Sequence, residues 1–97
     1  DPMSATDEKP ALQLPVVHLN GTGRKTLAVQ YEQASEGLRK ALDDMSAMGP
    51  NGRDYYVQGP GAFGRAVDQH VARCAKVRSV LEEVNALWLA LVDGETP

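Results

Sequence analysis

The chain has 97 residues, of which 42% are hydrophobic and 24% are charged, and its formal net charge at pH 7 is −3. This length allows one small domain. The acidic balance argues against a protein that coats nucleic acid through a general positive field. No run of about 20 apolar residues is present, and no charged stretch precedes an apolar one, so we expect neither a membrane span nor a secretory signal.

The N-terminal residues divide into a polar stretch and an extended arm. Asp1 and Pro2 precede Met3, so we interpret them as a cloning scar, and residues 1–10, polar and without a period, are expected to be disordered. In residues 11–19, Pro15 prevents a helix and restricts any strand to a sheet edge. The sequence offers no second strand. We therefore expect the arm to pack against helices or to cross to a neighbouring subunit, and we favour the crossing.

Residues 24–48 show the period of a helix with one apolar stripe. Spacings of four and three residues alternate along it, which is the seam of a coiled-coil-like helix. The stripe consists of Leu27, Tyr31, Ala34, Leu38, Ala41, Met45 and Met48, and is widened by Leu42.

Residues 62–92 carry a second, longer stripe with the same spacing. It consists of Phe63, Val67, His70, Val71, Cys74, Val77, Leu81, Val84, Trp88 and Leu91. Two such stripes, joined by a loop at residues 49–61, predict an all-α antiparallel two-helix hairpin, which makes residues 11–97 a single domain. The charged residues on the outer faces are most simply solvated.

In a two-helix hairpin, the sides of both apolar stripes stay exposed to solvent. A chain of this size is then only marginally stable as a monomer. We therefore predict a homo-oligomer, most simply a dimer that forms a four-helix bundle. A trimer or a dimer of dimers fits the two stripes equally well.

The segment before the first helix combines a turn, a hydroxyl and two cations. Asn20-Gly21 signals a turn, and Thr22 is a good N-cap residue. Arg24 and Lys25 then lie at the helix end whose partial positive charge prefers acids. This combination is a local anion-binding arrangement. Alternatively, both cationic side chains simply extend into water.

The loop at residues 49–61 is longer than a helix connection requires. Gly49 suits a C-terminal cap, Asn51-Gly52 a turn, and Pro60 the start of the next helix. These roles leave five further residues unexplained, namely Arg53, Asp54, Tyr55, Tyr56 and Gln58. Tyrosine rings can stack on a ligand, and a guanidinium can grip a phosphate or carboxylate. Alternatively, one tyrosine plugs the end of the bundle while Arg53 pairs with Asp54.

Two short motifs, HLNGT at residues 18–22 and PNGRDYY at residues 50–56, stand just ahead of the two helices. With these motifs the chain resembles a group of small, uncharacterised accessory proteins of bacteriophages and prophages. The resemblance covers roughly residues 14–92. It implies a phage or prophage origin, and with it the cytoplasm of a bacterial host cell, but no known activity. By analogy, small phage accessory proteins often antagonise host defence by gripping a host protein or sequestering a nucleotide signal.

The two motifs are separated by a helix about 37 Å long, so they cannot form one site within a subunit. In a head-to-tail dimer, the first motif of one subunit lies beside the second motif of its partner. The candidate ligand-binding residues of two such composite sites are Asn20, Thr22, Arg24, Lys25, Asn51, Arg53, Asp54, Tyr55, Tyr56 and Gln58. The leading hypothesis is a non-enzymatic binder of a small anionic ligand, plausibly a nucleotide second messenger, between subunits.

Other functional classes are weaker. No metal-ligand spacing or nucleophile–base pair is evident apart from His70 and Cys74 at i, i+4, so we expect no catalytic residues, metal or cofactor. The lone Cys74 cannot form an internal disulfide, which fits a reducing compartment. Cations are too few for a nucleic-acid partner. The alternatives are a protein-interaction module that inhibits a host protein and a structural coiled-coil scaffold.

Overall fold

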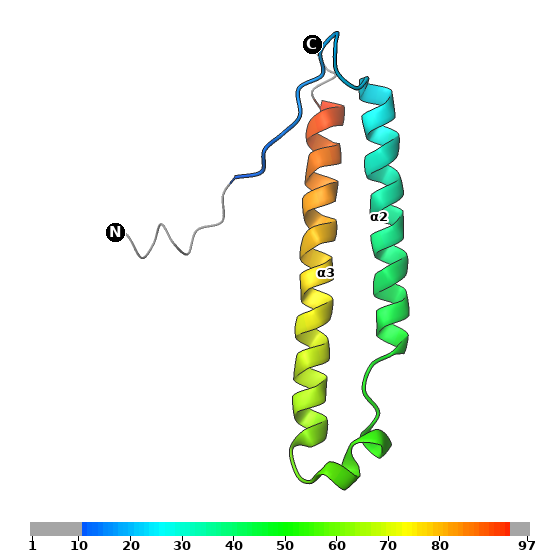
Figure 1. Cartoon of the computed structure of the whole chain (residues 1–97), viewed down its shortest axis with the longest axis vertical. Helices are drawn as coiled ribbons and strands as arrows, with labels where there is room; N and C mark the ends of the chain where they lie inside the picture. The colour runs from blue at the N-terminus through cyan, green and yellow to red at the C-terminus, as the bar shows by residue number, and fades with distance from the viewer. Residues whose placement is uncertain (1–10, 94–97) are drawn as a thin grey trace, which may run out of the picture.

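The computed structural model describes residues 11–93, and within this range it is all-helical, with no β-strand. Two long helices, α2 (Arg24–Ala47) and α3 (Ala62–Asp93), run antiparallel against each other (Figure 1). Two single turns of 3₁₀-helix, η1 (Gly52–Asp54) and η2 (Tyr56–Gln58), lie in the connection between them. The predicted helical hairpin is therefore confirmed. The expected disorder of residues 1–10 concerns residues outside the described range.

The helix bounds differ from the expected ones by one residue at two ends, but the capping residues differ more. Met48 is the C-cap residue of α2, and its N–H donates to the carbonyl of Met45, while the N–H of Gly49, the next residue, donates to the carbonyl of Ser46. Pro60 does not begin α3, because Gly59 and Gly61 adopt positive φ angles of 98° and 86° and turn the chain first. Only after this glycine turn does the helical backbone begin.

The apolar stripe of α2 faces α3, but α2 is rotated slightly about its own axis relative to the orientation that the sequence predicts. Tyr31, Leu38 and Met45 are half-buried as expected, but Ala34 is exposed and Ser35 is only 4% exposed. The Ser35 hydroxyl donates a 2.7 Å hydrogen bond to Oδ1 of Asn85 across the helix pair. The placement of Ala34 in the seam was therefore wrong, because this polar contact turns the neighbouring column of residues toward α3.

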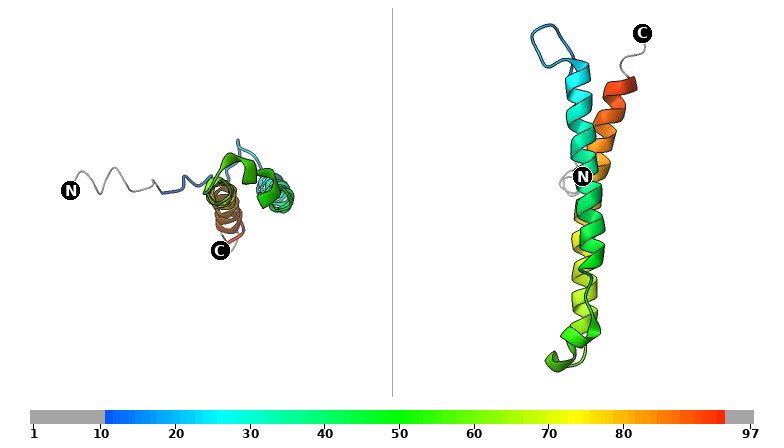
Figure 2. Two further views of the ribbon diagram at one scale, coloured as in Figure 1. Left: turned by 90° about the horizontal axis from the view of Figure 1, so that it is seen from below. Right: turned by 90° about the vertical axis from the view of Figure 1, so that its right-hand side faces the viewer.

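The stripe of α3 lies along α2 for most of its length. His70, Cys74, Val77, Leu81, Val84 and Trp88 are half-buried. At the tip end, Phe63 and Val71 remain mostly exposed. Among the described residues, Ala62 and Leu91 are the buried apolar ones, and no large side chain is fully buried. The hairpin is thus a thin pair of rods without an enclosed core (Figure 2).

The N-terminal arm leaves the rod on the side of α3 (Figures 1 and 2). Its apolar side chains are exposed, including Leu14, Val16 and, at 98%, Leu19; Val17 is half-buried. The arm therefore covers little of the hairpin's own surface, and its crossing to a second subunit stays a prediction.

Candidate functional site

The predicted site residues fall into two groups at opposite ends of the rod (Figure 1). Residues 20–25 lie where α2 begins, beside the C-terminal end of α3. Residues 51–58 lie in the connection at the far end, between α2 and α3. Within one chain the structure therefore does not bring the two groups together, as the length of the helix predicts.

The first group is built around a tight turn. The N–H of Gly21 donates to the carbonyl of His18 over 3.1 Å. The imidazole of His18 folds over this glycine so closely that a Cβ there would lie 2.7 Å from Nε2. A side chain at position 21 would therefore displace the exposed His18 ring from the turn.

Thr22 does not cap α2, which corrects the sequence-based expectation. Gly23 is the N-cap residue, with extended backbone angles and no side-chain capping bond. Since helical geometry begins only at Arg24, Thr22 lies one residue too early to reach the N–H groups of the first turn. The exposed hydroxyl of Thr22 and these N–H groups stay available for a ligand.

Arg24 and Lys25 differ in their surroundings. Lys25 is exposed, whereas Arg24 is half-buried and its Nε atom is buried without a hydrogen-bond partner among the described residues. No acidic residue lies in the first turn of α2. The helix N-terminus therefore carries two cations that no acid of that turn compensates.

In the second group, Asn51 and Tyr55 have structural roles. Oδ1 of Asn51 accepts a 3.1 Å hydrogen bond from the N–H of Arg53 and so caps η1. The half-buried ring of Tyr55 packs against Phe63, with ring centroids 6.4 Å apart and planes inclined by 43°. Tyr55 therefore closes the end of the hairpin, which was the structural alternative for one of the tyrosines.

The other members of the second group point to solvent. Arg53 and Asp54 are both exposed and form no ion pair with each other in the part of the chain described, so the expected pinning pair is absent. Tyr56 and Val57 are 75% and 76% exposed. The tip thus presents a cation, a carboxylate and an aromatic ring that the fold itself does not use.

A groove of about 180 Å³ opens beside the tip. It is lined by Tyr55, Gln58, Ala62, Arg65, Ala66 and Gln69. Gln58 was predicted as a site residue, but Arg65 and Gln69 were not, because a charged or polar residue on an outer helix position is normally solvated. Nothing in the sequence alone indicates that the glycine turn at Gly61 brings the connection against Arg65, whose Nη1 lies 2.9 Å from the position of a Cβ at that glycine.

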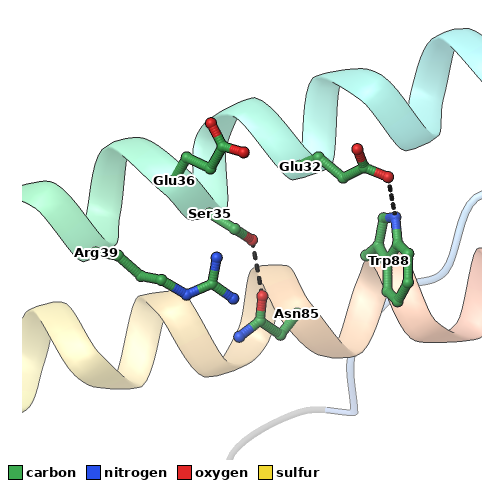
Figure 3. A pocket seen from close by; sticks show the side chains of 6 residues that line it. All are labelled: Glu32, Ser35, Glu36, Arg39, Asn85 and Trp88. Carbon is green, nitrogen blue, oxygen red and sulfur yellow. Dashed lines mark hydrogen bonds between the residues drawn. The ribbon is translucent and has the colours of Figure 1, made fainter.

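A second groove of about 280 Å³ lies between the middle of α2 and the C-terminal part of α3 (Figure 3). It is lined by Glu32, Ser35, Glu36, Arg39, Asn85 and Trp88. The indole N–H of Trp88 donates to Oε1 of Glu32 over 3.0 Å, next to the bond between Ser35 and Asn85. Arg39 extends along the groove toward Asn85. Glu32, Glu36 and Arg39 were predicted as solvated and Trp88 as a seam residue, whereas no role was predicted for Ser35 and Asn85. The two hydrogen bonds join α2 to α3 at this level.

His70 and Cys74 contact each other on α3, as their spacing predicts. The Cys74 sulfur lies 3.5 Å from Nε2 of His70, and both residues are half-buried in the helix pair. Across residues 11–93, no three His, Cys, Asp or Glu side chains are grouped so that they could hold a metal ion together. No helix in the same range has the length and apolar character to cross a membrane.

The geometry therefore offers two exposed polar clusters, one at each end of the rod, and a hydrogen-bonded groove between them. Comparison of the chain with protein-family models, with curated proteins and with solved structures found no match.

Proposed function

We propose that the protein is a non-enzymatic binder of a small anionic ligand, of the nucleotide second-messenger class, held at two equivalent sites shared between the subunits of a head-to-tail homodimer. In the phage setting that the sequence resemblance implies, such a binder would act against host defence by sequestering the signal. One observation carries the proposal. Two exposed polar clusters with complementary chemistry lie at opposite ends of one rod.

The chemistry of the two clusters supports an anionic, ring-bearing ligand. Arg24 and Lys25 at a helix N-terminus supply positive charge and free N–H groups for a phosphate. From the partner, Arg53 adds a planar cation, Asp54 an acceptor for sugar hydroxyls, and Tyr56 an exposed ring for stacking on a base. Tyr55, packed on Phe63, supports this surface.

The direct test is native mass spectrometry of the full chain, before and after incubation with a panel of cyclic and linear nucleotides. The proposal predicts an oligomer that gains an integral number of nucleotide masses, one per composite site. An oligomer that binds nothing in the panel overturns the nucleotide assignment. A protein that is monomeric at every concentration overturns the shared site itself.

Substitutions at the tip provide the second test. Arg53→Ala and Tyr56→Ala should each weaken nucleotide binding about tenfold or more, because each removes a charge-assisted or stacking contact, while the oligomer mass stays unchanged. The matched control is Arg78→Ala, which removes an exposed cation from the middle of α3. Equal loss of binding in the control would mean that only net charge matters.

A protein-interaction module is the second candidate, and the exposure of the tip favours it. Tyr56 and Val57 project beside Arg53, and residues of the Tyr and Arg types dominate binding energy at interfaces. If the protein is such a module, Tyr56→Ala should abolish its binding to a host protein, and the wild type should bind no nucleotide. A structural scaffold, the remaining alternative, would instead be sensitive at seam positions such as Leu38, Leu81 and Trp88.

A further inference from the structure

Residues seven positions apart on a helix lie in a column along one side of it. α2 has three neighbouring columns that could face another helix, and α3 covers two of them. The first column contains Tyr31, Leu38 and Met45, and the second contains Ala28, Ser35 and Leu42, all of them half-buried or buried. The third contains Leu27, Ala34, Ala41 and Met48, of which Ala34 and Met48 are exposed. Three columns are typical of a helix that faces more than one neighbour in a bundle.

The exposed column continues onto α3. Because the helices are antiparallel and repeat every seven residues, the α3 column beside it contains Arg73, Val80 and Leu87, and Arg73 is exposed. Val80 is 49% exposed and Leu87 is half-buried. We call this surface the apolar flank, and it consists of Leu27, Ala34, Ala41, Met48, Val80 and Leu87.

The opposite side of the helix pair carries polar side chains over the same length of the two helices. There the α3 column reads Val71, Arg78, Asn85 and Val92, so charged and amide side chains interrupt it. Glu32 accepts a hydrogen bond from Trp88 across the two helices on that side (Figure 3). The two flanks of the hairpin therefore differ. On the apolar flank the α2 column is apolar throughout and Arg73 is the charged member of the described α3 column, whereas the opposite flank carries Glu32, Arg78 and Asn85.

We propose that a second copy of this chain docks on the apolar flank, flank to flank and head to tail, about a two-fold axis that crosses α2 beside Gly37. The inference rests on the proposed function and specifies the subunit contact on which it depends. The column is symmetric about a point between Gly37 and Leu38, so Leu27 meets the partner's Met48 and Ala34 meets the partner's Ala41. A Cβ at Gly37 would meet nothing within 4 Å in the protomer. Small side chains at the centre let two helices approach closely.

The accessible surface supports a second copy as the occupant. Among the described residues no large side chain is fully buried, and Met48 and Val80 on the apolar flank are 58% and 49% exposed. A second copy that covers this flank would bury these side chains and supply the core that the hairpin lacks. A homodimer is also the commonest way for a small chain to complete its core.

This axis also explains how the two polar clusters meet. Such an axis places the start of α2 of one subunit beside the end of α2 of its partner. Arg24 and Thr22 then lie near the connection that holds Asn51 and Arg53. The contact between apolar flanks therefore brings the two clusters toward each other.

The first test compares Ala34→Glu with Ala86→Glu by analytical ultracentrifugation of the full chain. Both residues are exposed alanines at the same level of the rod, but Ala86 lies on the outer face of α3. Ala34→Glu should raise the dimer dissociation constant about a hundredfold, because it buries a carboxylate without a partner. Ala86→Glu should match the wild type. An unchanged constant for Ala34→Glu overturns the apolar flank as the interface but leaves a shared site possible through another contact.

A second variant is informative even if Ala34→Glu fails to fold. In a Cys74→Ser background, Gly37→Cys places a thiol on the proposed axis, where it meets its own copy. Mild oxidation should then give a covalent dimer, and Ala86→Cys in the same background should stay monomeric on a denaturing gel. Equal cross-linking of both variants, or none of Gly37→Cys, overturns the proposed axis. Nucleotide binding by an uncross-linked dimer would separate this failure from failure of the proposed function.

Discussion

Ser35 and Asn85 are polar side chains in the middle of an otherwise apolar seam. Their 2.7 Å hydrogen bond lies between two half-buried stretches, and Ser35 is buried more completely than any apolar side chain near it. A buried polar pair of this kind stabilises only when both members are present, but it penalises every other register of the two helices. We infer that the pair fixes which columns of α2 and α3 meet.

Removal of one member should cost more than removal of both. Asn85→Ala leaves the Ser35 hydroxyl buried without its acceptor, and we expect the free energy of unfolding to fall by about 1–3 kcal/mol. The double variant Ser35→Ala/Asn85→Leu should recover much of that loss. Urea unfolding followed by circular dichroism measures both. If the single and double variants lose equal stability, the hydrogen bond has no such role.

The sequence predicts the apolar period, but it does not predict which of two adjacent columns the partner helix covers. Ala34 and Ser35 are neighbours, and a period of 3.5 residues favours the alanine on hydropathy alone. The choice depends on Asn85, 50 residues away, and no local pattern encodes that contact. Tyr55 and Tyr56 show the same limit, because only the packing of Phe63 decides which ring is buried.

At the scale of elements, glycines and prolines make the helix bounds predictable to within a residue. The sequence does not predict the caps, because these depend on backbone angles in the turns. Thr22 has the side chain of a cap residue but lies one position too early, and Pro60 is separated from α3 by the turn at Gly61. The start of α3 is therefore set by backbone conformation at a glycine.

Two glycines three residues apart, Gly61 and Gly64, give a matched test of that statement. Gly61→Ala should destabilise the hairpin by about 1–2 kcal/mol, since its φ of 86° is unfavourable for residues with a Cβ. Gly64→Ala should stabilise it by about 0.5–1 kcal/mol, because this glycine is helical and a Cβ there meets nothing within 4 Å. Thermal unfolding of both variants compares them. A destabilised Gly64→Ala or a neutral Gly61→Ala would contradict the account.

At the scale of the whole molecule, the hairpin is too thin to enclose a core, as the sequence length already indicates. If its stability depends on a second copy, unfolding must depend on protein concentration. For a dimer, a tenfold increase in concentration should raise the free energy of unfolding by about 1.4 kcal/mol and move the urea midpoint upward. A midpoint that is constant over a hundredfold range of concentration would show a self-sufficient monomer.

The candidate site could be predicted in composition but not in arrangement. The sequence identifies the residues at the two ends of the rod, and the helix length shows that they are apart. It does not reveal that Asn51 and Tyr55 support the tip from within, or that Arg65 approaches it. Those roles depend on the backbone conformation of the connection, which the residue types alone do not specify.

The central claim, a site shared between subunits, is tested most directly by mixing two defective variants. Arg24→Ala/Lys25→Ala removes one half of every site, and Arg53→Ala/Tyr56→Ala removes the other half. Neither variant alone should bind a nucleotide that the wild type binds in native mass spectrometry. After equal amounts are unfolded and refolded together, half of the dimers are mixed and each has one intact site, so about one quarter of wild-type binding should return. No recovery on mixing, with mixed dimers visible in the spectrum, would contradict a shared site.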